Sequence, residues 1–259
     1  MKSARAGVLG ERVWKAAAIA TLVGLPLLFA DWRFLGQLDF APLWTYRQVL
    51  LRGVGVTLLY VAGAAIVGYA AGTVLAITSR SAPRSLRMVA ILYVEFWRNT
   101  PLLVQLFWIH FAAPFLTGIQ TSIFVSGYIA LAANVSAYFC EIVRAGIGAV
   151  PSGQWDAAQS LGLRPVLVWR LAILPQAFRM ILPPATNLLI GILKASAILS
   201  VLGVNELMRL TGSLSTNTFR IVEFYTGTAV IYVALGLCIA ALSSRVERWS
   251  RSSGSRHGL

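Results

Sequence analysis

The run of residues 54–78 most constrains the fold, because it contains no charged residue over 25 positions. A helix rises 1.5 Å per residue, so this run can cross a bilayer core, which is about 30 Å thick, with some tilt. Charged residues make up 12% of the 259 positions, whereas about 25% is usual in soluble domains. The sequence therefore predicts an all-α integral membrane protein.

Six apolar runs are candidate membrane spans, and they occupy residues 16–30, 54–78, 102–116, 123–140, 181–204 and 224–242. The first run follows a basic N-terminus, which fits either a signal peptide or an anchor helix. Leu28 stands where a cleavage site requires a small residue, so we expect an uncleaved anchor. Before the third run, a short helix at 88–97 leads to Thr100-Pro101, which has the N-cap and first-turn pattern of a new helix.

The cations are distributed unevenly over the segments that join these spans. With the N-terminus in the cytoplasm, inner segments carry 16 of the 22 Lys and Arg residues, outer segments carry five, and Lys194 lies within a span. Cytoplasmic loops of membrane proteins carry such an excess, so the net charge of +13 reflects topology rather than nucleic-acid binding. The sequence thus predicts a multi-pass protein with both termini in the cytoplasm and with the loop 148–180 on the same side.

This loop is the longest interval without a membrane span, yet its composition indicates two short helices. Residues 154–161 favour a helix, Gly162 can end it in the left-handed conformation, and Pro165 suits the first turn of a second helix that ends before Pro175. Ala157 and Ala158 are expected to leave room for a neighbouring surface. The residues alone leave two alternatives, a hairpin that covers the ends of the spans and a docking site for a partner.

The loop resembles the EAA motif of ABC-importer permeases, with Asp156-Ala157-Ala158, Gly162 and Leu174-Pro175 in the motif positions. Four further segments, at 94–107, 141–146, 151–154 and 193–197, resemble the polar amino-acid subfamily of histidine, glutamine and glutamate permeases. The family pattern has Glu where this chain has Asp156, which keeps the charge and shortens its reach by one methylene. The N-terminal span is additional to the five-helix type I core of many relatives.

The resemblance implies a permease subunit of an ATP-driven importer of polar amino acids, with glutamate or aspartate as the favoured substrate. Residues 1–53 would form an anchor helix and an interfacial segment, 54–248 the transmembrane domain, and 249–259 a cytoplasmic tail. The implied partners are a dimer of ATP-binding subunits, a periplasmic amino-acid-binding protein, a second or sibling permease, and the lipid of a bacterial inner membrane. ATP and Mg²⁺ would bind the partner ATPase, and this chain would bind no cofactor.

Two sets of residues follow as candidates. The residues expected to couple to the ATPase are Gly153, Gln154, Asp156, Ala157, Ala158, Gly162 and Pro175. The residues expected to line the substrate pathway or its gate are Arg98, Pro101, Gln105, Asn134, Glu141, Asn187, Lys194 and Ser196. Arg98 and Glu141 are placed at cytoplasmic helix ends, where simple charge anchoring is the alternative. The neutral polar residues have an alternative role in bonds between helices, and Lys194 could pair with a carboxylate or reach the interface.

Several other function classes lack their residues. No Gly-Lys-Ser/Thr phosphate loop is present, and two Cys and two His without metal-ligand spacing predict no metal site. No nucleophile with a base indicates an intramembrane enzyme, so we expect a transport subunit without catalytic residues. An ion-gradient-driven secondary transporter for small polar solutes is the alternative, although the nine acids all fall at the ends of the predicted spans or in loops.

Overall fold

The computed structural model describes Trp14, Thr21 and residues 31–255, with the backbone alone for 249–255. The predicted first span at 16–30 lies outside the described residues apart from Thr21. Contacts divide the chain into two units, residues 1–42 and 43–259. In the first unit, helix α2 (Trp32–Leu35) begins at Asp31, whose carboxylate accepts hydrogen bonds from the backbone N–H groups of Arg33 and Phe34.

The rest of the chain is also helical. Its α-helices are α3 (Ala41–Thr45), α4 (Arg47–Ser81), α5 (Arg84–Asn99), α6 (Leu102–Phe107), α7 (Ala113–Thr117), α8 (Ile123–Gly148), α9 (Ser152–Ser160), α10 (Pro165–Leu167), α11 (Leu174–Ala195), α12 (Leu199–Leu202), α13 (Leu207–Thr218) and α14 (Ile221–Ser255). Two π-helical segments, η1 (Trp108–Ala112) and η2 (Val168–Ile173), and a 3₁₀ turn, η3 (Ser196–Ile198), join some of them.

Four continuous helical stretches among the described residues are long and apolar enough to span a membrane. They are Arg47–Ser81, Ile123–Gly148, Pro165–Leu202 and Ile221–Arg248, and they confirm the predicted runs at 54–78, 123–140, 181–204 and 224–242. The run at 102–116 is not a straight span of its own. It is broken into α6, η1 and α7, and together with α5 it forms a pair bent by 110°, which is a fifth span if the pair counts as one.

The largest helix contact of the core lies between α4 and α8. Ala64, Gly68 and Gly72 recur every fourth residue on α4 and are all buried there. A Cβ atom at Gly72 would lie 2.6 Å from the carbonyl oxygen of Ser136 on α8, so no side chain fits at this position. The stripe of small residues thus serves the close approach of α8, as small residues do in other membrane helix pairs.

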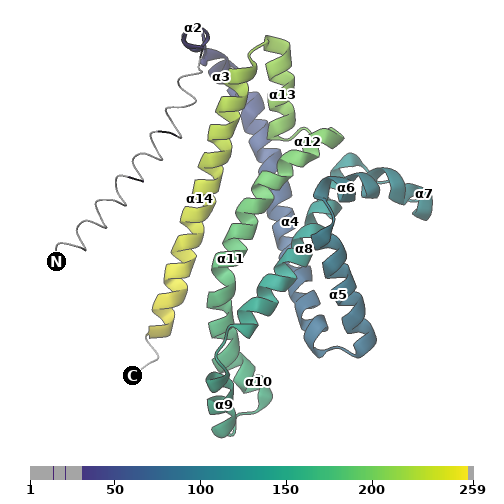
Figure 1. Ribbon diagram of the computed structural model, residues 1–259, viewed down its shortest axis with the longest axis vertical. Coiled ribbons are helices and arrows are strands. Elements are labelled where there is room, and N and C mark those ends of the chain that lie inside the picture. Colours follow the sequence, from purple (N-terminus) through teal and green to yellow (C-terminus); the bar gives the residue numbers. More distant parts are fainter. Residues whose placement is uncertain (1–13, 15–20, 22–30, 256–259) are drawn as a thin grey trace, which may run out of the picture. The chain divides into compact units, whose positions relative to one another are not determined.

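Helix α11 connects two groups of short helices that lie at opposite ends of the second unit (Figure 1). The hairpin of α9 and α10 lies at the end where α8 finishes, and α12 and α13 lie at the other end. Since α11 belongs to a stretch of 38 residues that can span the membrane, the two groups lie on opposite sides of it. The hairpin and the α12–α13 segment can therefore meet different partners.

Candidate coupling hairpin and substrate pathway

The loop predicted to contain two helices forms a helical hairpin. Helix α9 ends next to Gly162, which has a φ of +68°, and Pro165 occupies the first turn of α10. A Cβ atom at Gly162 would meet nothing within 4 Å, so the backbone conformation alone requires glycine here. The predicted roles of Gly162 as the helix end and of Pro165 as the next helix start are confirmed.

The second helix of the hairpin does not end before Pro175, which corrects the sequence-based expectation. Leu174 keeps a helical conformation, with φ −57° and ψ −43°, and its N–H bonds to the carbonyl of Trp169, five residues earlier. The wider π turn of η2 accommodates the proline ring, which would otherwise clash with the carbonyl four residues before it. The hairpin therefore continues into α11 as one helical stretch, Pro165–Leu202.

Aromatic and amide contacts hold α9 against this stretch. The rings of Trp155 and Trp169 meet edge to face with centroids 5.1 Å apart, and Gln176 Nε2 donates a 3.0 Å hydrogen bond to Gln154 Oε1. Ala158 is buried, with 5% of its surface exposed. Its small side chain thus serves the internal packing of the hairpin and not an outer surface, unlike our expectation for both alanines.

The opposite side of α9 is open. Gly153, Asp156 and Ala157 are exposed, and the Asp156 carboxylate makes no hydrogen bond or ion pair with the described residues. Asp156 and Ala157 therefore form a small, shallow face with one negative charge at its centre. The hairpin is packed on its other side and is continuous with α11 in one helical stretch.

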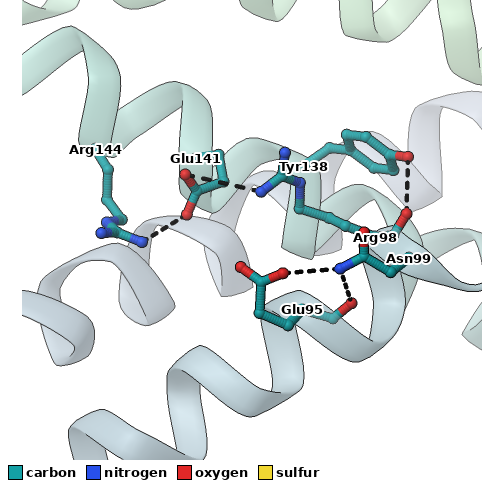
Figure 2. A network of polar contacts seen from close by, with 6 residues as sticks. All are labelled: Glu95, Arg98, Asn99, Tyr138, Glu141 and Arg144. Atoms are coloured by element: carbon teal, nitrogen blue, oxygen red, sulfur yellow. Dashed lines mark hydrogen bonds and ion pairs between the residues drawn. The ribbon is translucent and has the colours of Figure 1, made fainter.

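A second group of candidate residues joins α5 to α8 (Figure 2). Arg144 Nη1 lies 2.7 Å from Glu141 Oε1, and Arg98 Nη1 lies 3.8 Å from Glu141 Oε2. Tyr138 donates a hydrogen bond to the Arg98 carbonyl, and the Arg98 guanidinium carbon lies 5.7 Å from the centroid of the same ring. Glu141 therefore lies between two arginines, and one of them comes from the end of another helix.

Arg98 lies at the end of α5 that is remote from the basic turn before this helix. It follows Arg84, the first residue of α5, by 14 positions, and at 1.5 Å per residue this places it about 21 Å along the helix. If Arg98 is not counted, the predicted inner segments still carry most of the Lys and Arg residues. The Arg98–Glu141 pair therefore lies well beyond the basic turn that precedes α5.

Gln105 and Asn134 stabilise the sharp bend that follows Arg98. Gln105 is buried, with 3% of its surface exposed, and its Nε2 donates to the carbonyls of Trp97 and Thr100 at 2.8 and 3.0 Å. Asn134 Nδ2 donates to Trp97 O at 3.2 Å and to Gln105 Oε1 at 3.1 Å. Pro101 has no N–H, so these amides take the place of the missing helical donors. The structure favours bonds between helices for both residues.

Only part of the remaining pathway set is accessible. Ser196 is fully buried and donates to the Leu193 carbonyl at 2.8 Å. Asn187 and Lys194 are exposed on α11, on the same face as Pro184 and Gly191. Neither polar side chain makes a hydrogen bond or ion pair with the described part of the chain, and the spacing of three and four residues aligns all four along one stripe.

Glu206 is one of the nine acids expected at the ends of spans or in loops, and its carboxylate is buried. It is fully buried at the start of α13, where it accepts hydrogen bonds from the backbone N–H groups of Met208 and Arg209 and from the Tyr232 hydroxyl. Burial raises the pKa of the Glu206 carboxyl above its ordinary value, and these hydrogen bonds oppose the shift. An acid directly before a helical pattern is a cap signal, but its burial depends on α4 and α14.

A catalytic or metal-binding role finds no support in the side chains. Among the described residues, no group of three or more His, Cys, Asp and Glu could hold a metal ion. His110, which lies in η1, shares a 2.9 Å hydrogen bond with Ser126. The geometry therefore consists of an exposed face on the hairpin, a charged pair beside a bend, and a polar stripe on a span.

Comparison with known proteins shows which family has this architecture. Residues 68–252 match the family described as binding-protein-dependent transport system inner membrane component. The chain is 39% identical over 199 residues, 77% of its length and 91% of the relative, to a protein of Rickettsia conorii provisionally named glutamine transport system permease protein GlnP. It is 35% identical to the arginine transport system permease protein ArtQ of Bacillus subtilis, covering 84% of this chain and 99% of ArtQ.

A solved structure agrees with these relatives. The crystal structure of an amino acid ABC transporter with histidines superimposes with a TM-score of 0.77 and 38% identity, covering 82% of this chain and 99% of that chain. The protein is thus a multi-pass inner-membrane transport subunit and not an enzyme, and ATP hydrolysis falls to a partner subunit. The chain belongs to the binding-protein-dependent inner-membrane permeases, as the permease component of an ABC amino-acid importer.

Proposed function

We propose that two permeases, either two copies of this chain or this chain and a sibling, enclose a pathway for polar amino acids along the exposed stripe of α11. The observation that supports this proposal best is the exposure of Lys194 on a membrane span. A charged side chain at the centre of a span costs about 2.5–3.5 kcal/mol on insertion scales. Lys194 therefore requires water or a protein partner on its exposed side, and a pathway between two permeases supplies both.

In this arrangement Lys194 attracts the carboxylate of the substrate, and Asn187 offers an amide seven residues earlier on the same face. A cation on the pathway favours amino acids with a second carboxylate, glutamate and aspartate, over the cationic arginine. The names of the relatives refer to glutamine and arginine, so the acidic preference is the part of the proposal that most needs a test.

The hairpin would supply the energy coupling. We place the exposed face of Asp156 and Ala157 against an ATP-binding subunit, which holds ATP and Mg²⁺. Both termini of this chain would lie on the same side of the membrane as that subunit. Closure of the ATPase dimer would move the hairpin, and α11 would move with it because the two form one helical stretch. Gly153, Gln154, Gly162 and Pro175 shape that unit, and the Arg98–Glu141 contact would open or close as the span moves.

Membership of an ABC importer family removes the ion-gradient alternative. The test is ATP-driven uptake of radiolabelled glutamate, glutamine and arginine into proteoliposomes that contain the permeases, the ATPase and the binding protein. We expect Lys194→Gln to lower glutamate uptake about tenfold and arginine uptake much less, since it removes a charge-assisted contact worth about 1.4 kcal/mol or more.

Arg52→Gln is the matched control, because Arg52 is an exposed cation on α4 and is not part of the stripe on α11. Equal losses for glutamate and arginine in Lys194→Gln, with normal assembly, would contradict the role of Lys194 in selectivity. Uptake by a complex that lacks the ATPase would contradict the coupling.

A further inference from the structure

A polar cavity of about 550 Å³ lies beside α13, at the end of α11 opposite the coupling hairpin. Residues from three elements line it: Ser200 from α12, Tyr225 from α14, and Arg209 and Ser213 from α13. Asn205, in the loop between α12 and α13, also lines the cavity. The volume is within the range of about 300–1,000 Å³ that is usual for small-molecule sites.

The packing of α13 explains why this cavity is polar. Leu207 and Leu214 are buried on one face of the helix, in the cluster around Phe224. Arg209 and Ser213 are four residues apart, so they share another face, and both are exposed. The sequence of α13 therefore separates an apolar face that fixes the helix from a polar face that lines the cavity.

The charge in this cavity has one sign. Arg209 is the only ionised side chain among the residues that line it, and it forms no ion pair with the described residues. The neighbouring acid, Glu206, is directed elsewhere, since its carboxylate accepts from two backbone N–H groups of α13 and from the Tyr232 hydroxyl. The cavity thus presents an unneutralised guanidinium surrounded by hydroxyl and amide groups.

We propose that this cavity is a second amino-acid site, in which Arg209 binds the α-carboxylate of a substrate on the side of the membrane opposite the ATPase. The guanidinium matches a carboxylate with two parallel hydrogen bonds, and the side-chain oxygens of Asn205, Ser213 and Tyr225 can accept from the α-ammonium group. The site rests on the proposed function, because it would hold the amino acid before it reaches the stripe on α11.

The experiment measures the binding of free L-glutamine and L-glutamate to the assembled permease–ATPase complex in nanodiscs, without binding protein, by saturation-transfer difference NMR. The complex carries Lys194→Gln, so that the pathway stripe does not contribute the carboxylate contact. We expect Arg209→Gln to weaken binding about tenfold or more, and Arg209→Lys to weaken it less because it keeps the charge and loses the fork. L-glutaminamide, which lacks the α-carboxylate, is expected not to compete.

Arg52→Gln removes a cation outside the cavity and is expected to bind as the parent does. Ser213→Phe fills the cavity without changing its charge and is expected to abolish Arg209-dependent binding. Binding that is unchanged in Arg209→Gln would overturn the inference. The inference would also be overturned if the only effect of Arg209→Gln were that uptake needs a higher concentration of binding protein. In that case Arg209 would contact an acidic side chain of the binding protein.

Uptake by the wild-type complex, with ATP and binding protein, separates the two proposals. If the wild-type complex accumulates no amino acid, the proposed function fails. If it transports normally and the free amino acid shows no Arg209-dependent binding, only the second site is disproved.

Discussion

Two prolines at helix junctions, Pro101 and Pro175, have opposite effects on the chain. Before Pro101, Thr100 is extended, with φ −107° and ψ 144°, and the helices on its two sides meet at 110°. Before Pro175, Leu174 remains helical and the stretch Pro165–Leu202 continues through it. A residue before proline is disfavoured in the helical region, so the first junction follows the local preference and the second does not.

The difference lies in what replaces the lost backbone bond. At the bend, Gln105 and Asn134 donate to the carbonyls of Trp97 and Thr100, so the break leaves none of these acceptors without a donor. At Pro175, the π turn of η2 moves the backbone hydrogen bond of Leu174 to a spacing of five residues, and Gln176 Nε2 donates to the Ala172 carbonyl in the same turn. A bend in a membrane protein therefore requires nearby polar side chains as well as a proline.

Gln105→Leu tests the polar support of the bend and should have the largest effect. The substitution leaves buried carbonyls at Trp97 and Thr100 with fewer donors, and we expect it to lower the free energy of unfolding by about 3 kcal/mol. Thermal unfolding of the purified permease in detergent measures this change. Gln120→Leu, at an exposed position, is the control; equal stability of the two variants would show that the amide does not support the bend.

Gly162→Val tests the hairpin from which α11 continues. Valine resists the positive φ of this position, and we expect a cost of about 2 kcal/mol together with loss of ATP-driven uptake, while membrane insertion is retained. Gly162→Asn keeps uptake close to the wild-type rate, since asparagine tolerates the left-handed conformation. Normal transport by the valine variant would mean that the angle of the hairpin does not matter.

Replacing each proline by alanine compares the two junctions directly. We expect Pro101→Ala to destabilise the permease by about 1 kcal/mol, because the proline restricts the unfolded chain and fits the extended conformation already present. We expect Pro175→Ala to be neutral or slightly stabilising, since Leu174 is already helical and the alanine restores an N–H. Chemical denaturation of both variants is the measurement, and the opposite ranking would invalidate our explanation of the difference.

Glu141→Gln should lower the free energy of unfolding only slightly. Glu141 and its two arginine partners have side chains that are about one-third to two-fifths exposed, so the loss is expected to be about 0.5 kcal/mol. Uptake should fall more than stability does if the pair with Arg98 acts in a gate. Glu95→Gln, next to Asn99, is the comparison; a similar fall in uptake there would assign the effect to local charge alone.

Local sequence signals predicted the parts of the site that depend on nearest neighbours. The end of α9 at Gly162 and the start of α10 at Pro165 each depend on steric properties of single residues, and the structure confirms them. The pairing of Arg98 with Glu141 and the burial of Glu206 involve separate helices. No local pattern contains that information, so neither the pairing of Arg98 with Glu141 nor the burial of Glu206 could be predicted.

The sequence by itself determined that this chain crosses a membrane several times and carries a helical hairpin between two spans, because apolar length, cation distribution and turn residues act locally. Its motifs also resemble those of ABC-importer permeases. Only the tertiary structure decided which polar residues support the fold and which remain available. Gln105 and Ser196 satisfy buried carbonyls, whereas Lys194 and Arg209 face open space. That division depends on which helices pack together, and packing is a property of the whole chain.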